Sequence, residues 1–198
     1  KADYTQRIVL VPMRTQVSAE AHDGGAPIVF ETGRTLAALA VRITSVLAFD
    51  GVTYSDKTAD NQGAIPYHPF GVTGRSGSAL YIGFQYHKDY KGVNGQSRLQ
   101  FPKVDLDLAI RVNGKSRLDG RSVECGNKTL RTYASADVVW EVWDGNGWQE
   151  LDVVKDDTLA FTRTGHVIVQ TPVPGVMKPG KLGDPGQGQE NFYLRARL

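Results

Sequence analysis

The chain has 198 residues, of which 40% are hydrophobic and 22% are charged. A chain of this length buries roughly 70% of the surface that its unfolded form exposes, so it needs neither a metal nor a disulfide to fold. Its 23 basic and 21 acidic residues are interspersed without a basic cluster, which argues against nucleic-acid binding. No apolar run approaches the roughly 20 residues that span a bilayer, so we expect no membrane partner.

Alternation of apolar and polar residues with a period of two runs along the chain and predicts β-strands. In chain order, the strand-like runs are 7–11, 27–30, 80–84, 104–110, 138–143, 148–153, 166–169 and 192–198. Turn-forming pairs such as Asn94-Gly95, Asp119-Gly120 and Thr164-Gly165 separate these runs. The pattern predicts an all-β protein, an antiparallel β-sandwich or jelly-roll-like fold with room for one short helix.

Two stretches bear on the organisation of the chain. Apolar residues in 35–47 recur at helical spacing, but several of them are β-branched and stiff, so we expect a strand there. The polar, proline-containing stretch 54–78 is a candidate boundary between an N-terminal β segment, 1–72, and a β-sandwich module, 73–198. The two segments are also compatible with a single packed unit. A second Pro- and Gly-rich stretch, 171–191, predicts a long loop, either functional or a simple excursion between strands.

The most informative segment is 138–153, where two apolar runs flank Asp144-Gly145-Asn146-Gly147. This pattern predicts a β-hairpin, because glycine and asparagine tolerate positive φ angles. A four-residue loop sets the register, and the expected opposed pairs are Trp143 with Trp148, Glu141 with Glu150, Trp140 with Leu151, and Val138 with Val153.

The two faces of this hairpin differ in chemistry. One face is apolar enough to be core, whereas the other carries Trp143, Trp148, Glu141 and Glu150. Opposed tryptophans contribute about 0.2–1 kcal/mol, and opposed glutamates cost a similar amount unless a cation lies over them. We expect that either another part of the chain or a partner protein covers this second face, and the sequence leaves both open.

The sequence contains no recognisable catalytic apparatus. The histidines His22, His68, His87 and His166 show no metal-ligand spacing, and no P-loop occurs. Asp105 and Asp107 alternate with apolar residues, so we expect a solvated strand face. The run 156–158, Asp-Asp-Thr, is either part of a calcium site or a polar turn, and we expect the turn. We therefore predict no enzyme, no metal and no cofactor.

The single cysteine, Cys125, cannot form an internal disulfide, which is typical of proteins folded in a reducing compartment. A nucleophilic or metal-binding thiol is the alternative, but no histidine is near it in sequence. No signal peptide is visible. Because the chain begins at Lys1 and stops at Leu198 inside a strand-like run, we expect a piece of a longer polypeptide; a mature secreted protein is the alternative.

A run of motifs in the C-terminal part resembles a known family. The motifs are a WEVWDG hairpin at 140–145, a D-x-T turn at 156–158, an R-T-G turn at 163–165, a V-x-V-x-x-P strand at 167–172 and a closing strand at 192–198. In this order they resemble baseplate assembly proteins of the baseplate-J-like type, from contractile phage tails and phage-tail-like injection systems. Further matches are ALYIGF at 79–84, P-x-x-T-x-V at 12–17 and F-E-T at 30–32.

The resemblance implies a structural baseplate component that assembles with other baseplate subunits, such as wedge or hub proteins. It implies assembly in the bacterial cytoplasm and then a place in the baseplate of the particle. For the partner-binding surface we expect Trp143, Trp148, Glu141 and Glu150, with Pro179 and Asp184 of the long loop. Departures from the family pattern, among them Val142 in place of tyrosine, are conservative for packing.

The alternative function is a carbohydrate-binding module of jelly-roll type, with a surface glycan as its ligand. Planar aromatic side chains form the binding platforms of such modules, and Trp143, Trp148 and Tyr81 are the candidates here. A hydrolase with a dispersed site ranks below both functions.

Overall fold

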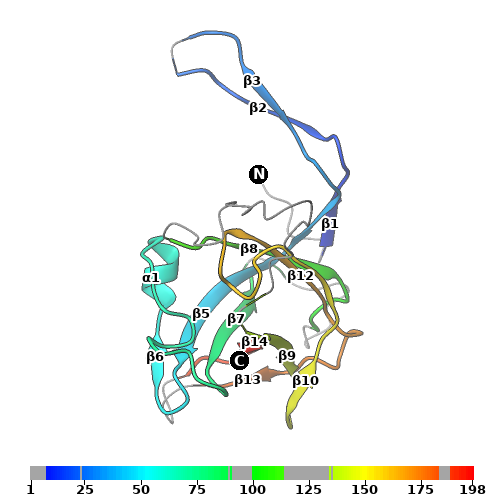
Figure 1. Ribbon diagram of the computed structural model, residues 1–198. Helices are drawn as coiled ribbons and strands as arrows, with labels where there is room; N and C mark the ends of the chain where they lie inside the picture. Colours follow the sequence, from blue (N-terminus) through cyan, green and yellow to red (C-terminus); the bar gives the residue numbers. More distant parts are fainter. Residues whose placement is uncertain are drawn as a thin grey trace, which may run out of the picture. The chain divides into compact units, whose positions relative to one another are not determined.

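The computed structural model describes residues 8–22, 24–88, 90, 100–113, 134, 136–182 and 188–198, and these residues confirm the all-β prediction (Figure 1). The described strands are antiparallel where their register is given, and one short helix accompanies them. The elements in chain order are β1 (Ile8–Val11), β2 (Gln16–Ala19), β3 (Ile28–Glu31), β4 (Leu36–Leu39), β5 (Val41–Phe49), β6 (Tyr54–Asp56), α1 (Thr58–Gln62), β7 (Ala79–Tyr86), β8 (Asp105–Ile110), β9 (Val139–Trp143), β10 (Trp148–Glu150), β11 (Val153–Asp156), β12 (Gly165–Gln170), β13 (Pro179–Gly180) and β14 (Asn191–Arg197).

The chain divides into two units, a smaller one of residues 1–41 and 86–99 and a larger one of residues 42–85 and 100–198. The expected strand at 35–47 is confirmed, since β4 and β5 occupy it. The division at residue 72 stays a prediction. Cys125, Asp184 and the turn pairs Asn94-Gly95 and Asp119-Gly120 lie outside the described residues.

Strands β1 to β4 of the smaller unit form one long β-hairpin. β1 pairs with β4 from Ile8↔Leu39 to Val11↔Leu36, and β2 pairs with β3 from Gln16↔Glu31 to Ala19↔Ile28. The step from Val11 to Gln16 equals the step from Glu31 to Leu36, so both ladders keep one register. In Figure 1, β2 and β3 run side by side as an extended ribbon. We call residues 8–39 the ribbon, β1/β4 its base ladder and β2/β3 its tip ladder.

The larger unit is built on a seven-stranded sheet in the order β10-β9-β14-β7-β5-β6, with β13 on β14. The central strands β7 and β14 read as nearly continuous apolar runs, as expected for strands that are buried on both faces. One face carries Trp140, Val142, Leu194 and Ala196, which sit in register and are almost fully buried. Its opposite face carries Glu141, Trp143, Tyr193 and Arg195 and is described below.

A second, three-stranded sheet of the larger unit has the order β11-β12-β8. Val167 and Val169 of β12 are fully buried, and Leu108 of β8 lies opposite Val167. Asp105 is exposed and Asp107 is partly exposed, so the alternation read from the sequence is correct. The larger unit thus contains two antiparallel sheets with buried apolar residues, which gives it its sandwich-like character.

The turn after β11 has an unusual backbone. Leu159, Ala160 and Phe161 have φ angles of 51°, 56° and 62°, in the left-handed region that costs residues other than glycine about 1–2 kcal/mol each. Phe161 offsets this cost by stacking on Trp140, with ring centroids 5.9 Å apart, and by packing edge-on against Phe70. The turn therefore packs its aromatic side chain against Trp140 of the seven-stranded sheet and against Phe70.

Candidate functional site

The predicted hairpin is present as β9–β10, with the predicted register at its tip. Trp148 lies opposite Trp143, and Glu150 lies opposite Glu141. Asp144 closes the loop, because its Oδ1 accepts hydrogen bonds from the amides of Asn146 and Gly147, both at 2.7 Å. These two backbone donors lower the pKa of the Asp144 carboxyl from its ordinary value.

The predicted pairing is wrong farther from the loop. The amide of Leu151 still donates to Trp140 O at 2.8 Å, but Val153 pairs with Val169 of the other sheet and not with Val138. Val153 is 42% exposed, so it is not a core residue. The chain leaves β9 after Leu151, and the register of β11 shifts between Val153 and Lys155, which simple extrapolation from the turn does not foresee.

The opposed glutamates have the cationic cover that their pairing requires. Arg195 of β14 lies next to Glu141 in register and its Nη2 approaches Glu141 Oε2 at 2.7 Å, while Arg197 Nε lies 3.1 Å from the same oxygen. Glu141 is 6% exposed, whereas Glu150 is exposed to solvent. The buried carboxylate is therefore held by two guanidinium groups, and the repulsion between the two glutamates is relieved inside the chain.

Aromatic rings form a continuous row on this face of the sheet. Centroid separations are 4.7 Å for Phe49–Tyr54, 5.5 Å for Tyr54–Tyr81, 5.4 Å for Tyr81–Trp148 and 5.5 Å for Trp148–Trp143. The guanidinium carbon of Arg195 lies 4.1 Å from the Trp148 ring centroid, a cation–π contact. Desolvation and the Tyr81 hydroxyl raise the pKa of Tyr54 to about 12. The row belongs to a small second core.

The chain itself covers part of this face. The amide of Lys178 donates to Trp143 O at 3.0 Å, and a Cβ added to Gly180 would lie 2.7 Å from Trp143 Nε1. Pro179 pairs with Phe192 beside it, and Leu182 packs on the same cluster. The structure thus brings together Trp143, Trp148, Glu141, Glu150 and Pro179. Their role in binding a partner stays a prediction.

This arrangement does not favour a sugar platform. Tyr81 is only 4% exposed, the Trp148 ring has a guanidinium over it, and Trp143 has the backbone of Gly180 against its pyrrole edge. Sugar-binding aromatic residues need an open ring face. The half-buried tryptophans support the packing of the larger unit instead.

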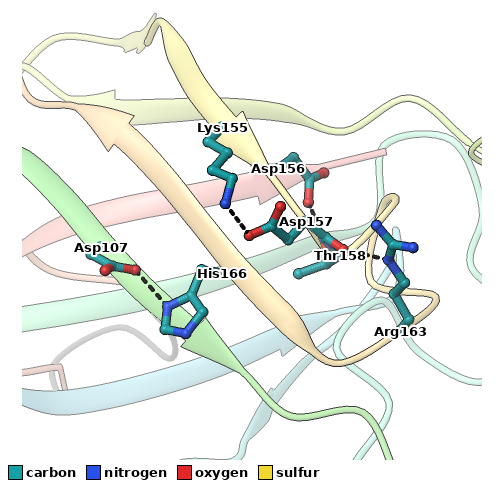
Figure 2. Close-up of polar contacts among 7 residues, drawn as sticks. All are labelled: Asp107, Lys155, Asp156, Asp157, Thr158, Arg163 and His166. Atoms are coloured by element: carbon teal, nitrogen blue, oxygen red, sulfur yellow. Dashed lines mark hydrogen bonds and ion pairs between the residues drawn. The ribbon is translucent and has the colours of Figure 1, made fainter. Parts of the chain in front are cut away.

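A polar cluster lies on the three-stranded sheet and the turn after it (Figure 2). His166 Nδ1 lies 2.8 Å from Asp107 Oδ1, and Lys155 Nζ lies 2.7 Å from Asp157 Oδ2. The Lys155 ammonium is the main cause that holds the pKa of Asp157 below its ordinary value, and Arg163 and His166 add to it.

The only hydroxyl drawn in this cluster is committed to the turn. Thr158 is fully buried; its Oγ1 donates to Asp156 Oδ1 at 2.6 Å and accepts from the Phe161 amide at 3.0 Å. Asp156 also accepts from the Thr158 amide at 2.6 Å. The run 156–158 is therefore a polar turn that fixes the left-handed segment. The His166–Asp107 pair orients an imidazole on the three-stranded sheet (Figure 2).

The ribbon of the smaller unit is a surface that sequence reasoning missed. It leaves large apolar side chains about half exposed: Val9 41%, Leu10 66%, Met13 54%, Val17 55%, Ile28 54%, Val29 57%, Phe30 54% and Leu36 37%. In the tip ladder Val17 lies opposite Phe30 and Ala19 opposite Ile28, so these four share one face. The sequence signal is that 8–11 and 28–30 are wholly apolar, which is unusual for strands of a two-stranded hairpin.

A knot of hydrogen bonds joins the two ladders of the ribbon. The hydroxyls of Thr15 and Thr32 both donate to Pro12 O at 2.7 Å, and the Arg14 amide donates to Thr32 O at 2.8 Å. Arg14 itself has a φ of 66°. The P-x-x-T and F-E-T motifs, far apart in sequence, thus meet at one point and fix the geometry of the ribbon.

No protein-family model matches the chain, and no curated protein matches it. Within the described ranges, no group of three or more His, Cys, Asp or Glu side chains is arranged to hold a metal ion. The part of the chain that the structure describes also contains no helix long and apolar enough to cross a membrane.

Proposed function

We propose that this chain is a non-catalytic structural component of a phage-tail-like baseplate, which acts by binding neighbouring protein subunits. The observation that carries the proposal is the ribbon. A two-stranded hairpin is marginally stable in water by itself, and exposed apolar patches larger than a few hundred Å² mark interaction sites. A surface of this kind is typical of a protein whose final state is an assembly.

The motif order supports the baseplate as the assembly. The D-x-T turn, and the knot that joins the P-x-x-T and F-E-T motifs, have structural roles in this chain. These are three of the motifs on which the resemblance to baseplate-J-like proteins rests. Motifs that fix loops and strand junctions are what a scaffold protein needs. Wedge and hub proteins of the baseplate are the partners we expect.

The proposal is tested in the host, first by reading the genes that surround the coding sequence. Sheath, tube and spike genes are expected next to it, whereas a neighbourhood of polysaccharide-degrading enzymes contradicts the baseplate. The double variant Val17→Ser/Phe30→Ser is then introduced and particles are counted by negative-stain electron microscopy. We expect normal levels of folded chain and at least a tenfold loss of complete particles. Particles at the normal yield would show that the ribbon has no part in assembly.

A further inference from the structure

The ribbon has an internal symmetry that its exposure alone does not reveal. Base and tip ladders each contain four residue pairs in one common register, and the hydrogen-bonded knot lies midway between them. The base ladder is wholly apolar. In the tip ladder, Val17, Ala19, Ile28 and Phe30 form an apolar face, whereas Gln16, Ser18 and Glu31 lie on the opposite face with Val29. The middle carries the polar residues Arg14, Thr15, Thr32 and Arg34. Reversing the direction of the ribbon therefore exchanges the base ladder for the apolar face of the tip ladder and leaves the polar middle in place.

We propose that two copies of this chain associate through their ribbons in an antiparallel, two-fold arrangement, with the tip ladder of one copy on the base ladder of the other. The inference rests on the proposed function as an assembly protein and names its partner. In a two-fold interface the same patch serves both copies. The tip-on-base contact therefore occurs twice, all four ladders are covered, and the association closes at a dimer.

The available area agrees with this occupant. The eight large apolar side chains of the ribbon are exposed by 37–66%. Half-exposed side chains of that number leave on the order of 800 Å² per copy, and a standard interface buries about 800 Å² of each partner. Two-stranded ribbons are strongly twisted, so two of them wrap around each other and each covers more than one face of its partner.

The charges of the ribbon fit a copy of itself better than a charged ligand. With histidine taken as neutral, the charged residues of 8–39 are Arg14, Arg34, Glu20, Asp23 and Glu31, which give a net charge of −1. A nucleic acid or an acidic lipid surface attracts a strongly basic patch, which this composition does not provide. An apolar surface with a net charge near zero, such as a second ribbon, fits it better.

The oligomeric state of the full chain tests the proposal directly. Sedimentation equilibrium is measured over a range of concentrations for the unaltered chain, for Phe30→Asp and for Val72→Asp. Val72 is 85% exposed and belongs to the larger unit, so its variant is the matched control. We expect a monomer–dimer equilibrium whose dissociation constant rises at least a hundredfold in Phe30→Asp and is unchanged in Val72→Asp. Circular dichroism spectra of all three chains should agree.

Cross-linking tests the direction of the pairing. Ala19 lies on the apolar face of the tip ladder and Ala38 lies in the base ladder; both are exposed, and their distances from the middle of the ribbon differ by one residue. In a Cys125→Ser background, a short bis-maleimide should join Ala19→Cys of one copy to Ala38→Cys of the other. It should not join two Ala19→Cys copies, whose thiols lie about 37 Å apart in the antiparallel arrangement.

The outcomes separate this inference from the function it rests on. A chain that is monomeric at every concentration, or a dimer that Phe30→Asp leaves intact, overturns the paired ribbons. Efficient joining of two Ala19→Cys copies overturns the antiparallel direction. If the chain is monomeric and the ribbon variant still loses particles in the host, self-association is wrong and the assembly function stands. Normal particle yield from that variant shows that the ribbon has no part in assembly and removes the observation that carries the proposed function.

Discussion

Strands β3 and β14 have similar chemistry but opposite environments. All four residues of β3, Ile28–Glu31, are exposed, whereas Phe192, Tyr193, Leu194 and Ala196 of β14 are each at most 6% exposed. β14 lies between β7 and β9, but β3 pairs with β2 alone among the described strands. The burial of a strand in this protein therefore depends on how many strands lie beside it. Its apolar residues show only which side chains could be buried.

The largest expected effect comes from truncating one large side chain in each environment, buried and exposed. Trp140 is 1% exposed and stacks on Phe161, so Trp140→Ala should lower the free energy of unfolding by about 3–5 kcal/mol. Phe30 is 54% exposed, and Phe30→Ala should change the free energy of unfolding of the monomer by no more than about 0.5 kcal/mol. Urea unfolding at low protein concentration measures both. Equal losses would mean that the ribbon is part of the cooperative core.

The second test addresses the polar face of the large sheet. Glu141→Gln leaves Arg195 and Arg197 without their shared carboxylate, and Arg195 is only 14% exposed at its side chain. Removing one partner of a buried ion pair costs about 3 kcal/mol. Glu150→Gln is the control, since Glu150 is exposed and has no such cover. Chemical denaturation of both variants decides whether the network holds the hairpin to β14, and similar midpoints would argue that it does not.

Sequence reasoning succeeded for contacts between residues close in sequence and failed for contacts between residues far apart in sequence. Trp143 and Trp148 were placed opposite each other because a four-residue turn determines their register locally. The need for a cation over Glu141 was also foreseen, but Arg195 is 54 residues away in sequence, so its identity depended on the strand order. Val153 was misplaced because a long-range pairing with Val169 replaces the extension of the hairpin.

The ribbon shows a second limit of sequence reasoning, which predicts strands but not what covers them. Alternation and apolar runs identified strands at 7–11 and 27–30, and those strands exist. Nothing in the residues themselves says whether a third strand or a second sheet will cover them. The Pro12, Thr15 and Thr32 motif residues were noted only as a family likeness, and the structure gives them a physical role as the hydrogen-bonded knot.

The third test concerns Asp144 in the turn of the β9–β10 hairpin. It compares the pH dependence of stability of the unaltered chain with that of Asp144→Asn. The backbone donors of Asn146 and Gly147 lower the pKa of Asp144, so its ionised form favours the folded state. This contribution is present above the unfolded-state pKa near 3.8 and is lost as the pH falls through the lower folded-state pKa. In Asp144→Asn, the melting temperature should therefore fall less steeply between pH 5 and pH 2 than in the unaltered chain. The loss of stability at pH 7 should be smaller than for Trp140→Ala or Glu141→Gln. Thermal melts from pH 7 to pH 2 measure it, and unchanged steepness would contradict the assignment.

The smallest expected effect lies in the knot of the ribbon, where hydrogen bonds and backbone conformation, and not buried side chains, hold the strands together. Arg14 has a φ of 66°, which costs a residue other than glycine about 1–2 kcal/mol, whereas glycine pays about 0.5–1 kcal/mol in entropy. Arg14→Gly should therefore stabilise the ribbon by up to about 1 kcal/mol.

Hydrogen exchange at the amide of residue 14, which donates to Thr32 O at 2.8 Å, reports this gain as slower exchange. Arg34→Gly removes the same kind of side chain at a position outside the left-handed region, so it should speed exchange or leave it unchanged. Slower exchange in both variants would point to the loss of positive charge as the cause. Slower exchange in Arg14→Gly alone would show that the ribbon keeps its shape through the geometry of its own backbone, ready for a partner to cover it.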